Sequence, residues 1–196
     1  MKTNRRSFIF GALGAAAAAG CRSFPSVSSK KGWVDLQVNG RVGVSFNDPS
    51  LTVEQVKKVA EILSADGTEH FLPTVCTCSD ETACRCLGTI RAAMRRYPVC
   101  APAILGFHME GPFISDVPGY SGAHDRRLVR DPDTAVYDRW MDASDGLVRI
   151  VTVCGLRKGA EAFVRHATSA GTVVSLGHSP ITKTEDLNRL AAAGAK

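Results

Sequence analysis

From Trp33 onward, short runs of mostly apolar, β-branched residues alternate with longer segments in which apolar residues recur every three or four positions. The short runs predict β-strands and the longer segments predict amphipathic helices. The predicted strands cover 33–38, 70–77, 103–110, 147–154 and 172–178. The predicted helices cover 53–65, 80–97, 134–143 and 160–170, and residues 182–196 begin the next unit.

The order of these elements indicates the fold class. The strands are largely apolar and are separated by helices, which is typical of parallel strands joined by helical crossovers. Five such units in line predict an α/β fold, either a doubly wound sheet or part of a (β/α)₈ barrel. A complete barrel takes about 250 residues, so the chain is expected to be too short to close one.

The N-terminal segment has a different pattern. Residues 1–21 combine a basic start, an apolar alanine-rich run and Cys21, which is the layout of an export signal. Arg5-Arg6 is similar to a twin-arginine signal, and the sequence before Cys21 is similar to a lipoprotein cleavage box with Cys21 as the lipidated residue. A plain N-terminal anchor helix is the alternative. Residues 22–31 form a polar, serine-rich tether, and 32–196 form the folded domain.

The net charge of the chain adds little to the expected function. The formal net charge is +5, and removing Lys2, Arg5 and Arg6 with the signal lowers it to +2. A charge this small gives no reason to expect a nucleic-acid partner. Contact with a membrane is expected only through the lipid anchor.

Six cysteines follow the signal, namely Cys76, Cys78, Cys84, Cys86, Cys100 and Cys154. Export would permit disulfides among them. The two C-x-C pairs suggest a metal site, but Cys84 and Cys86 lie two apart on a predicted helix and do not share a face. Buried thiols, or one or two disulfides, are therefore expected in place of a four-cysteine metal site.

Polar residues gather where the predicted strands end. His108 and Glu110 end the third strand, His178 ends the fifth, and Gln37 and Asn39 end the first. Chemistry in parallel α/β folds collects at these ends, and residues i and i+2 of a strand share a face. A carboxylate and imidazoles at one barrel mouth can bind a metal such as zinc. The alternative is that the histidines are hydrogen-bonded structural residues.

Over Trp33–Lys196 the chain resembles a known family. It is similar to the N-acetylglucosamine-6-phosphate deacetylases of the amidohydrolase superfamily in the segments WVDLQVNG, FLPT, GFHMEGPF, GYSGAHD and VVSLGHSPIT. The resemblance implies parallel βα units that form an incomplete TIM-type (β/α)₈ barrel of about five strands. An open half-barrel exposes strand edges, so a homodimer or dependence on a missing partner segment is expected.

The resemblance also implies a metal site. Glu110 and His178 match metal ligands of the family. Gln37 and Asn39 stand where many amidohydrolases have the histidines of a second metal site, and a neutral amide binds zinc poorly. One divalent metal is therefore implied, zinc with iron as the alternative.

Two further residues receive roles from the resemblance. His108 would lie near the metal and orient the site, and His124 matches a histidine that contacts the substrate. The family's catalytic aspartate would lie beyond Lys196, so the chain's own catalytic residue is unknown.

The implied function is metal-dependent removal of the acetyl group from N-acetylglucosamine 6-phosphate or a related N-acetyl amino sugar. The signal indicates an exported protein, periplasmic or lipid-anchored at the membrane, although the family is usually cytoplasmic. The alternative is a non-catalytic exported lipoprotein or binding module derived from a deacetylase.

Replacing Arg5 and Arg6 together by lysine tests the export signal. If the pair directs twin-arginine export, the variant should stay in the cytoplasm, as cell fractionation would show. Unchanged export would rule out that route. In the same assay Cys21→Ser should lose labelling by a fatty-acid probe if Cys21 carries the lipid.

Overall fold

The computed structural model describes residues 32–196. The predicted export signal, Cys21 and the tether at 22–31 lie outside the described residues and stay predictions. Within the described part, no helix combines the length and apolarity needed to cross a bilayer.

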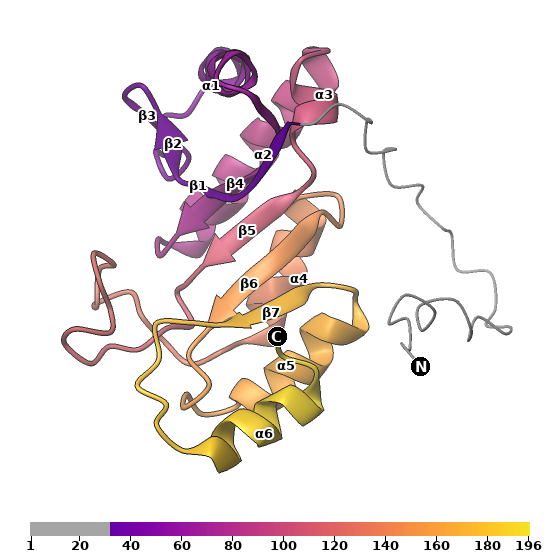
Figure 1. The fold of residues 1–196 in the computed structure, drawn as a ribbon. Helices are drawn as coiled ribbons and strands as arrows, with labels where there is room; N and C mark the ends of the chain where they lie inside the picture. The colour runs from indigo at the N-terminus through magenta and orange to yellow at the C-terminus, as the bar shows by residue number, and fades with distance from the viewer. Residues whose placement is uncertain (1–31) are drawn as a thin grey trace, which may run out of the picture.

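A five-stranded parallel sheet forms the centre of the domain (Figure 1). Its strands, in spatial order, are β1 Trp33–Val38, β4 Thr68–Cys76, β5 Phe107–Glu110, β6 Val148–Val153 and β7 Val173–Leu176. Spatial order therefore follows chain order, whereas a doubly wound sheet reverses direction at a switch point. This sequential order decides between the two predicted arrangements and confirms an incomplete TIM-type barrel.

Helices connect the strands and cover one face of the curled sheet. They are α1 Val53–Ala65, α2 Asp80–Arg96, α3 Cys100–Ala103, α4 Thr134–Ala143, α5 Ala160–Ser169 and α6 Thr184–Ala193. The helix starts follow local chemistry. Thr52 and Gln55 form a capping box at α1, and the Asp133 side chain accepts from two backbone N–H groups at α4.

Two short elements were not predicted. A two-stranded antiparallel ribbon, β2 Gly40–Arg41 and β3 Val44–Ser45, occupies a segment expected to be a loop. The single turn α3 delays the third strand, which was predicted from residue 103 and begins at Phe107. Elements of two to four residues are too short to show a hydrophobic period.

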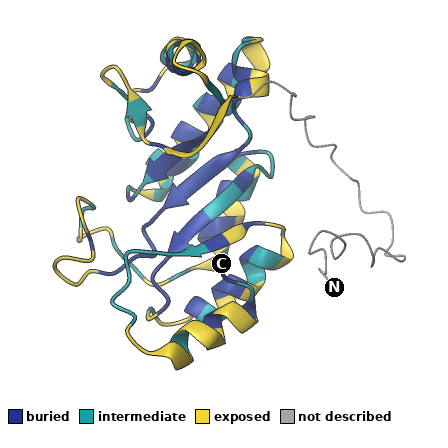
Figure 2. Ribbon diagram, in the orientation of Figure 1, coloured by how far each residue is buried: buried dark blue, intermediate teal, exposed yellow. Residues whose placement is uncertain are grey.

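The two faces of the sheet differ in character. The helix-facing side chains are apolar and fully buried, among them Phe71, Val75, Met109, Val151 and Val174. The inner face carries polar side chains that are also buried, namely Thr74, His108, Glu110 and Thr152. Figure 2 shows the central strands buried and the outer helix faces exposed. The strands were predicted to be largely apolar, and the inner face departs from that because it lines the site.

The six cysteines of the described part are free thiols. Cys86, Cys100 and Cys154 are buried, as one of the predicted alternatives requires. Cys86 is fully buried in the core, whereas Cys84, two residues earlier on α2, is half-buried with its thiol toward the Arg139 carbonyl oxygen of α4.

Among the described residues, β1 pairs with β4 alone. Trp33, Val34 and Leu36 on this edge strand are 77%, 50% and 54% exposed. An apolar edge strand favours association with another chain. Dimerisation, or dependence on a partner segment, stays a prediction.

Phe163 should contribute strongly to stability. Its ring packs edge-on against Phe113 and Tyr137, with centroids 5.1 and 5.7 Å away, and only 1% of the residue is exposed. Phe163→Ala should lower the free energy of unfolding by about 3–5 kcal/mol in urea titrations. Trp33→Ala is the matched control, since exposed substitutions change stability by about 0.5 kcal/mol or less. Equal losses in both variants would contradict this assignment of the core.

Candidate active site

Glu110 is the last residue of β5 and lies at the centre of the candidate site. Its strand neighbours in register are Cys76 of β4 and Thr152 of β6. The chain then turns at Gly111, which has a positive φ of 93°. A Cβ at Gly111 would overlap the hydroxyl of Thr77, so this close approach requires glycine.

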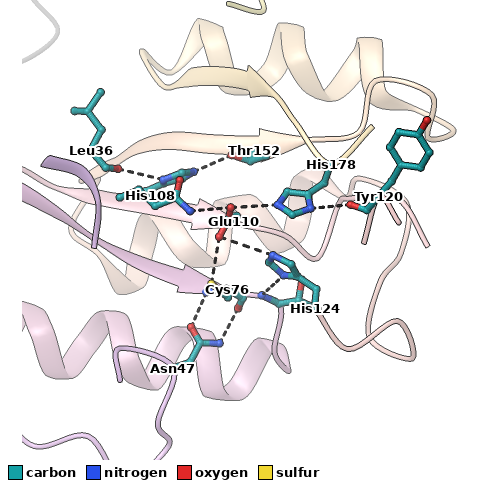
Figure 3. Close-up of polar contacts among 11 residues, drawn as sticks. Leu36, Asn47, Cys76, His108, Glu110, Tyr120, His124, Thr152 and His178 are labelled. Carbon is teal, nitrogen blue, oxygen red and sulfur yellow. Dashed lines mark hydrogen bonds and ion pairs between the residues drawn. The ribbon is translucent and has the colours of Figure 1, made fainter. Parts of the chain in front are cut away.

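Four side chains from separate segments surround the Glu110 carboxylate (Figure 3). Gln37 Nε2 donates to Oε1 at 2.9 Å, and the Cys76 thiol donates to Oε2 at 3.3 Å. His178 Nε2 lies 3.3 Å from Oε1, and His124 Nε2 lies 3.8 Å from Oε2. The structure thus brings together Glu110 and His178, the predicted ligands, with Cys76 and His124, whose side chains are of types that can bind a metal.

Glu110 is 8% exposed, and its carboxylate remains ionised. Burial opposes ionisation, but the hydrogen bonds from Cys76, Gln37 and His178 outweigh burial and hold the pKa of Glu110 below its ordinary value. The site therefore presents a negative charge at neutral pH.

His178 faces this carboxylate with a defined nitrogen. Its Nδ1 lies 2.8 Å from the Tyr120 carbonyl oxygen, which can only accept, so Nδ1 carries the proton. Nε2 lies 3.3 Å from Glu110 Oε1, which it can hydrogen-bond when it carries a proton or share through a metal ion when it does not. Gly122 lies against this ring, and a Cβ there would come 3.3 Å from His178 Cε1.

His124 comes from the loop that follows β5. Its Nδ1 lies 2.8 Å from the Thr77 hydroxyl, and its ring packs edge-on against His178 with centroids 4.7 Å apart. Burial, helped by the charge of His178, lowers the pKa of His124 against the opposing effect of Glu110. His124 is therefore neutral near pH 7, and because its Nδ1 accepts from the Thr77 backbone N–H at 3.4 Å, its proton lies on Nε2, toward Glu110 Oε2.

The donor atoms of Cys76, Glu110 and His124 all lie within 4.8 Å of one another. Thiolate, carboxylate and imidazole are the ligand types that zinc takes in proteins, so these residues fit a divalent metal. In the absence of a metal, burial and then the charge of Glu110 raise the pKa of Cys76 to about 12, so the thiol is neutral. Cys78, Cys84 and Cys86 are not part of this group among the described residues.

Sequence reasoning did not identify Cys76 as a site residue. The available signal was its position, because Cys76 ends the second strand as Glu110 ends the third. Parallel pairing places the two residues in register at the mouth. The prediction instead compared the cysteines with one another.

The other predicted site residues lie near the same mouth. A cavity of about 560 Å³ is lined by Gln37, Asn39, Cys76, Glu110, His124 and His178, among others. His108 lies deeper and makes no hydrogen bond to Glu110; it bonds the Leu36 carbonyl oxygen at 3.2 Å and Thr152 Oγ1 at 2.8 Å. Its proposed role in orienting the site stays a prediction.

No protein-family model matches the chain. Among curated proteins, it is 27% identical over 166 residues to the N-acetylglucosamine-6-phosphate deacetylase of Bacillus subtilis, covering 84% of this chain and 41% of the relative. It is 34% identical over 155 residues to the Caenorhabditis elegans protein of that name, covering 76% of this chain and 36% of the relative.

Solved structures show a similarity to proteins of the same name. The N-acetyl-D-glucosamine-6-phosphate deacetylase of Mycobacterium smegmatis, in complex with N-acetyl-D-glucosamine-6-phosphate, superposes with a TM-score of 0.75 at 30% identity. The match covers 84% of this chain and 41% of that one. The Pasteurella multocida enzyme gives 0.73 at 27% identity, with the same two coverages of 84% and 41%.

These comparisons confirm the predicted resemblance to the N-acetylglucosamine-6-phosphate deacetylases. They also confirm that it covers only part of those proteins, because the chain spans about 40% of the length of the curated relatives it matches.

Glu110 should make the stability of the metal-free protein depend on pH. Its folded-state pKa lies below the unfolded value of about 4.3, so the contribution is present above that value and is lost as pH falls through the folded pKa. Urea titrations from about pH 7 to about pH 3 in a chelator should show a shallower loss in Glu110→Gln than in the wild type. The exposed Glu185→Gln is the control, and an identical slope in all three proteins would contradict this.

Proposed function

We propose that this chain supplies the metal-binding part of an active site that removes the acetyl group from N-acetylglucosamine 6-phosphate or a related N-acetyl amino sugar. One observation carries the proposal. The ionised Glu110 carboxylate lies at the mouth of the half-barrel with His178 against one oxygen and His124 near the other, in a chain that resembles the named deacetylases.

A single divalent metal fits this site, with Glu110 and His178 as ligands and zinc or iron as the candidates. When bound, such a metal polarises an acetamide carbonyl and lowers the pKa of a bound water. Gln37 donates to Glu110 Oε1 and so fixes the carboxylate while adding no charge. Asn39 is likewise neutral, which argues against a second metal beside the first.

The cavity accounts for substrate access. Its volume of about 560 Å³ is within the range of small-ligand sites. His124 lines this cavity and is neutral near pH 7, so its ring can exchange a hydrogen bond with a sugar or acetamide group. We therefore assign His124 to substrate contact, while its nearness to Glu110 also allows metal contact.

The cellular location of the protein affects which substrate it can meet. We propose that the protein is exported, because residues 1–21 are similar to a twin-arginine or lipoprotein signal. Sugar phosphates are mainly cytoplasmic metabolites, so export favours an N-acetyl amino sugar without the phosphate.

The test measures acetate release from N-acetylglucosamine 6-phosphate and from N-acetylglucosamine. It uses the chain alone and the chain joined to the part of the Bacillus subtilis deacetylase that follows the matched region. The chain alone should show little turnover, since it spans 41% of that relative. The joined protein should release acetate, and Glu110→Gln should reduce kcat/KM by at least about 100-fold.

His124→Asn should act differently and mainly raise KM, because it removes a substrate contact rather than a charge. Glu185→Gln is the matched control on the exposed surface of α6. If the folded, metal-loaded joined protein released no acetate from any N-acetyl amino sugar, the proposed hydrolysis would be wrong. Sugar binding without hydrolysis would instead favour the non-catalytic binding module.

A further inference from the structure

Cys76 is held in place by a residue from another loop. Its backbone N–H donates to Asn47 Oδ1 at 2.5 Å, and Asn47 Nδ2 donates to its carbonyl oxygen at 3.0 Å (Figure 3). Asn47 thus continues the hydrogen-bonding pattern past the end of β4. The Cys76 side chain is thereby fixed on the inner face, in register with Glu110.

The Cys76 thiol is not part of the apolar core. Cys76 lines the cavity and donates to a carboxylate, whereas Cys78, two residues along, is partly buried and packs against the core. A buried structural thiol would lie among apolar side chains, as Cys86 does. The position of Cys76 therefore calls for another explanation.

The distances between the donor atoms of Cys76, Glu110 and His124 suit a shared metal ion. Cys76 Sγ and Glu110 Oε2 are 3.3 Å apart, and Glu110 Oε2 and His124 Nε2 are 3.8 Å apart. Tetrahedral zinc, with bonds of about 2.3 Å to sulfur and about 2.0 Å to oxygen or nitrogen, places neighbouring donors roughly 3.3–3.5 Å apart. The three donors need only small side-chain adjustments to meet one ion.

We propose that Cys76 is a metal ligand in this chain and that it binds, as a thiolate, the same ion as Glu110. This inference rests on the proposed function, since it concerns the same site, and it adds a ligand that sequence reasoning did not assign. Metal binding displaces the thiol proton to solvent. A thiolate donor favours zinc over magnesium and manganese, which prefer oxygen ligands.

The surrounding groups are consistent with this ligand set. His124 Nε2 lies 3.8 Å from Glu110 Oε2, the same carboxylate oxygen that Cys76 contacts. Gln37 donates to the other carboxylate oxygen, Oε1, which also faces His178, so Oε2 is the oxygen directed toward Cys76.

The experiment titrates the metal-free full chain with Co²⁺, which replaces zinc and reports on its ligands by absorption. The wild type should show a near-ultraviolet sulfur-to-cobalt charge-transfer band. Cys76→Ser should lose this band and should bind zinc at least about 10-fold more weakly in chelator competition. Cys78→Ser is the matched control and should keep both.

A second measurement needs no variant and so does not depend on folding of a mutant. Zinc should slow alkylation of Cys76 by iodoacetamide in the wild type, while alkylation of Cys78 should be unchanged, as mass spectrometry of peptides would show. A charge-transfer band that survives in Cys76→Ser, or Cys76 alkylation unaffected by saturating zinc, would overturn the inference.

The outcomes separate this inference from the proposed function. If Glu110→Gln weakens metal binding while Cys76→Ser leaves the band and the affinity unchanged, Cys76 is not a ligand but the deacetylase proposal stands. If the charge-transfer band is present but the joined protein releases no acetate, the thiolate ligand stands and the reaction is wrong.

Discussion

A carboxylate buried inside a barrel-like sheet is the constraint on which this site depends. Glu110 is 8% exposed, and an ionised group there is stable only if charge or hydrogen bonds compensate it. The compensation comes from Gln37, Cys76, His124 and His178, which lie up to 73 positions from Glu110 in the chain. These segments meet only when the strands are already paired in order, so the site can form only in the folded domain.

The curl of the sheet makes that meeting geometrically feasible. β4 separates β1 from β5, yet His108 of β5 reaches the Leu36 carbonyl oxygen of β1 and Thr152 of β6. A flat sheet would hold β1 and β5 about 10 Å apart, beyond the reach of such a bond. The apolar outer face packs against the helices and supplies stability, which leaves the inner face free to carry polar groups.

The sequence predicted what depends on local pattern. The helix at 134–143 was predicted to the residue because its apolar positions have a helical period, and the structure shows Asp133 capping it. Glu110 and His178 were placed at strand ends because parallel strands share one functional edge. Cys76 was missed because its partners depend on register and on Asn47, which lies 29 positions away. The residues next to Cys76 do not show these partners, and its one signal was its position at a strand end.

The charges of the proposed ligands affect both the binding of the metal and the acidity of a water bound to it. Glu110 and a Cys76 thiolate together balance a divalent ion, whereas Glu110 with neutral histidines leaves one positive charge in excess. A balanced site lowers the cost of burying the ion and so strengthens binding. The same balance weakens the ability of the ion to acidify a bound water, which depends on net positive charge. The neutral amides of Gln37 and Asn39 leave this balance unchanged. With Cys76 bound as proposed, metal retention and water activation would be opposed in this site.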